Sequence, residues 1–177
     1  IRGGQRTLGD MFRAAGYTSG FVGKYHLGAN FYKKGSNTFV LGNAPDSDVD
    51  FTRPMREGAL ERGFDYSFLA LRGIQDSPYA FFENDALLGS SEAMINWAIG
   101  DYGDTKIETA GIGLPSWNTR AVGDSLLSKA VEFIDSHRSR STSPFFLYLN
   151  TQAVHSPYKP SLTLGQRTIL GASGLSL

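Results

Sequence analysis

The spacing of apolar residues predicts a short helix that leads into a strand near the start of the chain. Apolar residues recur at helical spacing over residues 7–15, where Thr7 and Asp10 have the spacing of a capping box and Gly16 suits the end of the helix. The short apolar run 18–22 then predicts a strand. A helix followed by a strand is half of an α/β repeat, and in open α/β sheets ligands collect beyond the carboxyl ends of the strands.

A second unit of the same kind lies near the other end of the chain. Residues 124–137 carry apolar side chains at helical spacing, and Asp124 offers an N-terminal cap. The run 144–150 predicts a buried strand after a short loop. His137 stands at the end of the helix, where a partner of the helix dipole is a better interpretation than a ligand. His155 follows the strand, so both units lead to polar residues beyond a strand end.

The segments between these units are less regular. Residues 29–54 are rich in turn-forming residues and contain few apolar ones, which predicts a long surface excursion. Residues 84–118 are interrupted by glycines, although 86–99 is compatible with a helix. Together the segments predict an α/β layered fold.

Composition narrows the possible functions only slightly. The 177 residues include 17 basic and 17 acidic side chains, so no broad charge favours nucleic acid as a partner, and any anion binding must be local. The absence of cysteine excludes disulfides and thiolate metal sites. No apolar run approaches the roughly 20 residues of a membrane-spanning helix, so we expect no membrane span.

Three groups of motifs carry a resemblance to a known family. The segment 16–28 reads GYTSGFVGKYHLG and contains Lys24 and His26, and the segment 144–157 runs from PFFLYLN to His155 and Pro157. Between them lie GFDY at 63–66 and SPYAFFEND at 77–85. The first segment resembles the second signature of the type I, formylglycine-dependent sulfatases, and the others resemble segments of bacterial sulfatases. Together these matches extend over most of residues 5–160.

The resemblance implies an alkaline phosphatase-like fold, a layered sheet with helices on both faces that is incomplete in this chain. Residues 1–177 would form the central part of the catalytic domain. The implied activity is that of a sulfuric ester hydrolase acting on a sulfated glycan or an aryl sulfate. Such a site needs fixed cations and a proton donor, because charge builds on the bridging oxygen as the S–O bond breaks.

The resemblance also implies a role for each site residue. Lys24 would bridge the sulfate and a hydrated formylglycine, and His26 would contact the formylglycine and help to regenerate its aldehyde. His155 would hydrogen-bond the sulfate and protonate the leaving alcohol. Glu83, Asn84 and Asp85 are either polar turn residues or supports for the cleft.

Other family features have no counterpart in the sequence. The chain has no [CS]-x-P-x-R motif from which formylglycine is made, and we assign no residue to the calcium (Ca2+) site that the family implies. We therefore expect a central portion of a longer enzyme that is inactive by itself. The complete protein would need a formylglycine-generating or sulfatase-maturing enzyme as a partner, and we expect it to be periplasmic or extracellular.

Two alternatives remain open. A phosphatase or phosphonate monoester hydrolase of the same superfamily would share the sheet and differ in the nucleophile segment. A non-catalytic paralogue could hold a sulfated glycan through Lys24 and His155 without turnover.

Overall fold

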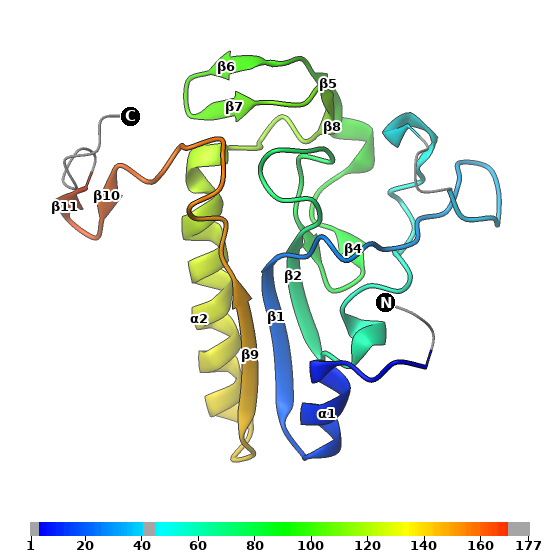
Figure 1. The fold of residues 1–177 in the computed structure, drawn as a ribbon, viewed down its shortest axis with the longest axis vertical. Helices are drawn as coiled ribbons and strands as arrows, with labels where there is room; N and C mark the ends of the chain where they lie inside the picture. Colours follow the sequence, from blue (N-terminus) through cyan, green and yellow to red (C-terminus); the bar gives the residue numbers. More distant parts are fainter. Residues whose placement is uncertain (1–3, 41–44, 170–177) are drawn as a thin grey trace.

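The computed structural model of the protein describes residues 4–40 and 45–169 and contains a five-stranded mixed sheet with the strand order β4-β3-β2-β1-β9 (Figure 1). Its strands are β1 (Thr18–Lys24), β2 (Tyr66–Ala70), β3 (Phe82–Glu83), β4 (Ala86–Leu87) and β9 (Phe145–Asn150). The central strand β1 pairs in parallel with β2 and β9, whereas β3 and β4 are antiparallel. The α/β expectation is therefore confirmed.

Helix α1 (Leu8–Ala14) precedes β1, as the sequence predicts. The Thr7 hydroxyl accepts a hydrogen bond from the backbone N–H of Asp10, and the Asp10 carboxylate accepts one from the backbone N–H of Thr7. This reciprocal pair is the capping box, and it holds the pKa of Asp10 below its usual value. Phe12 stacks on Phe146 at a ring separation of 3.8 Å, which fixes α1 to one face of the sheet.

Helix α2 (Val122–Arg140) is longer than predicted at both ends. It continues from a 3-10 turn (Thr119–Ala121), and the Asn118 side chain, rather than Asp124, accepts the N-terminal hydrogen bond, from the N–H of Ala121. The predicted cap at Asp124 is therefore wrong, because the added turn places this residue inside the helix. His137 is buried in the last turn and bonds the Ser143 carbonyl oxygen at 2.7 Å.

The sheet has an apolar core on each face. Phe21 of β1 belongs to a cluster with Tyr25, Phe64 and Leu69, whereas the next residue, Val22, belongs to a cluster with the α2 residues. Successive side chains of a strand point to opposite faces, so β1 contributes to both cores. Its interior residues are all buried, as expected for a central parallel strand.

The segment 29–54 differs from the predicted surface excursion. Val49 and Phe51 are buried in the core cluster that contains Phe21, and Phe31 packs against this cluster. A long loop, rather than a long helix, therefore covers much of this face. The few apolar residues of the segment are widely spaced, so local periodicity did not reveal their burial.

Residues 84–118 form short strands and turns instead of a helix. The pairs are β5 (Ile95–Trp97) with β8 (Gly111–Gly113), and β6 (Gly100–Tyr102) with β7 (Thr105–Ile107). Residues 91–93 form a 3-10 turn, and a further small pair, β10 (Thr163–Leu164) with β11 (Arg167–Thr168), lies near the end of the described chain. The helix considered for 86–99 is wrong, because β5 is stabilised by a partner strand distant in sequence.

Strand β9 forms at the predicted place but is not buried. It occupies one edge of the sheet, and Phe145, Tyr148 and Leu149 are between 38% and 43% exposed. The apolar run indicated a strand with both faces covered. In the described part of the chain, β9 has partly exposed side chains and one unpaired edge.

Candidate active site

Lys24 is the last residue of β1 and lies at the carboxyl end of the sheet. Its side chain is partly exposed, and the next residue, Tyr25, is buried in the core. Burial raises the pKa of Tyr25. His26 is exposed and has a positive φ of 47°, and its backbone N–H donates to the Leu71 carbonyl oxygen at 2.7 Å. The chain therefore leaves β1 beside the end of β2.

Gly23 permits an unusually close approach of β1 to β9. Its φ is +129°, and a Cβ at this position would lie 1.8 Å from the carbonyl oxygen of Asn150. The Asn150 side chain donates a hydrogen bond from Nδ2 to the Lys24 carbonyl oxygen at 2.6 Å. The close approach of the two strands thus explains why a glycine precedes the lysine. The Asn150 hydrogen bond joins Lys24 directly to the end of β9.

The loop after β9 carries His155. Its backbone N–H donates to the Gln152 carbonyl oxygen at 2.8 Å, and its ring Nδ1 lies 2.6 Å from the Ser156 carbonyl oxygen. A carbonyl oxygen can only accept, so Nδ1 carries the hydrogen of this bond. The exposed ring then has Nε2 available for proton exchange.

The segment that follows His155 is anchored to two neighbouring elements. Ser156 donates to the Glu108 carboxylate at 3.1 Å, and Lys159 bonds Asp101 on β6 at 3.0 Å. Arg120, in the 3-10 turn before α2, donates to the Pro160 carbonyl oxygen at 2.7 Å. These contacts fix the path of the loop although His155 itself is exposed.

The three predicted residues share one end of the sheet. Lys24 ends β1, His26 follows β1 and His155 follows β9, and these two strands are parallel neighbours. Among the described residues there is no hydrogen bond or ion pair between any two of them. Figure 1 shows the chain leaving β1 and β9 at the same end of the sheet and in different directions.

Sequence reasoning missed several polar residues at this end. Arg72 is exposed two residues beyond β2, and Gln75 follows it. Gln152 lies between β9 and His155 and is only 7% exposed. The parallel order of β2, β1 and β9 was the missing information, because the carboxyl ends of parallel strands meet at the same edge.

The motif residues at 63–66 and 83–85 support the fold. The Asp65 carboxylate accepts a hydrogen bond from the Ser19 backbone N–H at 2.8 Å, and Glu83 accepts one from the Tyr66 hydroxyl at 2.8 Å. Asn84 accepts a bond from the Ser67 backbone N–H. Burial and the Glu83 carboxylate raise the pKa of Tyr66. These polar residues join strands of the sheet rather than line the carboxyl end of the sheet, where Lys24 lies.

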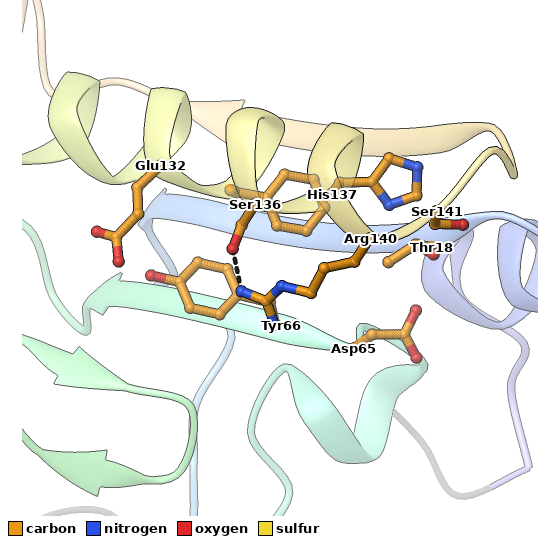
Figure 2. Close-up of a pocket in the computed structure, with 9 residues that line it drawn as sticks. Thr18, Asp65, Tyr66, Glu132, Ser136, His137, Arg140 and Ser141 are labelled. Carbon is orange, nitrogen blue, oxygen red and sulfur yellow. Dashed lines mark hydrogen bonds between the residues drawn. The ribbon is translucent and has the colours of Figure 1, made fainter.

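A pocket of about 420 Å³ lies at the opposite end of β1, between the sheet and the end of α2 (Figure 2). Its charged residues already have partners: Asp65 pairs with Arg13, Glu132 pairs with Lys129, and Arg140 donates to the Ser136 hydroxyl. Because it is at the amino end of the parallel strands, we do not place the active site there.

The described residues do not form a recognisable metal site. In residues 4–40 and 45–169, no group of three or more His, Cys, Asp or Glu side chains is arranged to hold a metal ion. The calcium site implied by the family resemblance therefore does not fit these residues, and the sequence has no [CS]-x-P-x-R motif from which formylglycine could form. The segment 168–174 resembles the family's approach to its metal-ligand strand, but we assign it no role, and its residues 170–174 lie outside the described residues.

The described part of the chain contains no helix with the length and apolarity needed to cross a membrane.

Comparison with known proteins identifies relatives of one kind. A family model described as sulfatase matches residues 1–168. A curated protein of Bacteroides thetaiotaomicron named N-acetylgalactosamine-6-O-sulfatase is 29% identical over 198 aligned residues, which cover 95% of this chain and 35% of that protein. The chain thus spans about a third of the length of this relative.

A solved structure gives a consistent result. Its description refers to the metabolism of multiple glycosaminoglycans by Bacteroides thetaiotaomicron and includes the abbreviation 6S-sulf. It matches with a TM-score of 0.65 and 27% identity, over 90% of this chain and 36% of the other.

Proposed function

Because the chain belongs to the sulfatase family, we propose that the complete protein hydrolyses sulfate esters carried by a glycan. The observation that carries the proposal is the close parallel pairing of β1 with β9, which joins Lys24 to the strand that leads to His155. The names of the relatives favour a 6-sulfated amino sugar of the glycosaminoglycan class as the substrate.

Each of the three residues suits one part of this reaction. The Lys24 ammonium is a compact positive charge that can bind the sulfate oxygens. As a nucleophile from outside the described residues bonds to sulfur and the bond between sulfur and the bridging oxygen breaks, the leaving oxygen takes a proton from Nε2 of a doubly protonated His155. His26 adds a polar group two residues beyond Lys24. We assign no nucleophile among the described residues.

The family resemblance implies calcium and formylglycine for the complete protein, and we retain both as part of the proposal. The described residues supply neither the metal ligands nor the formylglycine precursor, so no step is assigned to either group. A formylglycine-generating or sulfatase-maturing partner and a periplasmic or extracellular location belong to the same proposal.

The test is sulfate release by the full-length protein, produced together with a maturing enzyme. The substrates are N-acetylgalactosamine 6-sulfate, its 4-sulfate isomer, 4-nitrophenyl sulfate and 4-nitrophenyl phosphate. We expect the 6-sulfate to react fastest. Preference for the phosphate ester would favour the phosphatase alternative, and glycan binding without sulfate release would favour the non-catalytic alternative.

A further inference from the structure

Gln152 has a buried side-chain amide without a partner. The residue is 7% exposed, and neither its amide oxygen nor its amide nitrogen forms a hydrogen bond among the described residues. The amide oxygen of Gln75 is buried and unpaired as well. Since buried polar groups in folded proteins are nearly always bonded, each exception requires an explanation.

The two amide oxygens and the Lys24 side chain surround one point. A Cβ placed on Gly73 would lie 2.7 Å from the Gln75 amide oxygen, 3.0 Å from the Gln152 amide oxygen and 3.1 Å from Cδ of Lys24. Gly73 has a φ of +85°, and the space beside its Cα is filled by these three groups. They come from the segments that follow β2 and β9 and from the end of β1.

The chemistry of the three side chains is complementary. A lysine ammonium has three N–H donors and no acceptor, whereas an amide oxygen accepts. Nζ of Lys24 lies only two bonds beyond Cδ, and within the described chain it has no hydrogen bond or ion pair of its own. Acceptors without partners and the side chain that carries donors without partners therefore lie beside the same glycine.

We propose that Gln152, assisted by Gln75, is a positioning residue for Lys24. The two amide oxygens accept hydrogen bonds from the Lys24 ammonium and direct its remaining N–H group toward the sulfate ester. The inference rests on the proposed function for its consequence in catalysis. Gln152 acts through Lys24 and takes no direct part in bond breaking.

The main test is the variant Gln152→Met in the full-length protein, because methionine keeps the length of the side chain and removes both polar ends. We expect kcat to fall roughly 10- to 100-fold, as expected when a reacting group is misplaced by about an ångström, with little change in KM. The melting temperature should change little, because the loss of the hydrogen bond to the amide oxygen is offset by removal of the unpaired amide nitrogen from the interior. Gln166→Met, in the exposed turn between β10 and β11, is the matched control.

A second readout does not depend on activity. The rate at which acetic anhydride labels Lys24 is measured by mass spectrometry against the exposed Lys106. Loss of one ordinary hydrogen bond to the ammonium should raise the Lys24 rate about two- to tenfold in Gln152→Met. The variant Gln75→Met should show the same direction and serves as the second test if Gln152→Met does not fold.

The outcomes separate this inference from the proposed function. An inactive wild-type protein in which Gln152→Met still raises Lys24 labelling would contradict the sulfatase proposal and leave the positioning role standing. An active wild-type protein with unchanged Lys24 labelling and unchanged kcat in the variants would overturn the positioning role. A lower melting temperature with unchanged labelling would also overturn it, because it indicates a purely structural role.

Discussion

At the residue scale, the glycine of the Gly-Lys pair sets the separation of two strands. Gly23 places its Cα against the Asn150 carbonyl oxygen, and both the positive φ and the 1.8 Å approach of an added Cβ forbid a larger residue. We therefore expect Gly23→Ala to lower the free energy of unfolding by at least about 2 kcal/mol, from backbone strain and overpacking together. Urea denaturation of the full-length protein measures this loss.

Gly123→Ala is the control for that substitution. Gly123 lies in the first turn of α2, has no left-handed φ, and an added Cβ meets nothing within 4 Å. Alanine is the better helix former, so the same experiment should show a gain of about 0.5 to 1 kcal/mol. Equal losses at the two glycines would contradict the packing argument.

The proposed role of His155 predicts that its loss affects two substrates differently. If its Nε2 protonates the leaving oxygen, His155→Ala should slow the glycan sulfate by about 100- to 10,000-fold. The effect on 4-nitrophenyl sulfate should be much smaller, because that leaving group departs without a proton. Comparing kcat for the two substrates tests the role, and an equal loss on both would assign His155 to sulfate binding instead.

At the scale of elements, the Glu83 and Lys129 side chains join β3 to α2 through an ion pair of 2.9 Å. Burial tends to raise the pKa of Glu83, but hydrogen bonds from Lys129 and Tyr66 outweigh it and hold the pKa below its usual value of 4.5. A lowered carboxyl pKa stabilises the fold fully above the unfolded value, and the stabilisation is lost as the pH falls through the folded value.

Glu83→Gln should therefore cost about 0.5 to 1 kcal/mol at pH 7, a modest amount because the pair is partly solvated. The difference from wild type should shrink as the pH falls below 4.5, the usual pKa of the group. Glu132→Gln removes the more exposed partner of the same lysine and should have a smaller effect. Thermal unfolding across this pH range checks the prediction, which a pH-independent difference would contradict.

The elements also show what the sequence could predict. The α1–β1 and α2–β9 units were found because their signals are local: a capping box at Thr7, helical periodicity before His137, and apolar runs in the strands. The pair β5–β8 was missed because its stabilising contacts join residues 14 or more apart in sequence, Trp97 with Gly111 and Ile95 with Gly113 among them. Lys24 and His155 were predicted from their motif positions and stay a prediction, whereas Gln75 and Gln152 could be considered only once the strand order was known.

At the scale of the whole molecule, β9 leaves apolar side chains and an unpaired edge exposed. Phe145, Tyr148 and Leu149 are 38% to 43% exposed, and Leu127 and Val131 of α2 are about half exposed, at 53% and 48%. Exposed edges and apolar patches promote association. We expect the 177-residue chain, expressed by itself, to self-associate and to release no sulfate.

Analytical ultracentrifugation of this chain tests the expectation, with Tyr148→Lys as the variant that places a charge on the edge strand. The variant should shift the distribution toward monomer. A monomeric wild-type chain would show that the edge needs no further covering. Sulfate release by the chain alone, abolished by Lys24→Ala, would show that all catalytic groups are already present.

In the proposed function, Lys24 at the end of β1 binds the sulfate of a glycan ester. The most direct test of this role is kcat/KM for N-acetylgalactosamine 6-sulfate in the full-length protein carrying Lys24→Ala, beside the exposed-lysine control Lys106→Ala. We predict a loss of about 100- to 1000-fold for Lys24→Ala, the usual effect of removing one group that stabilises charge in the transition state, and wild-type kinetics for the control. Wild-type kinetics in both variants would contradict the account.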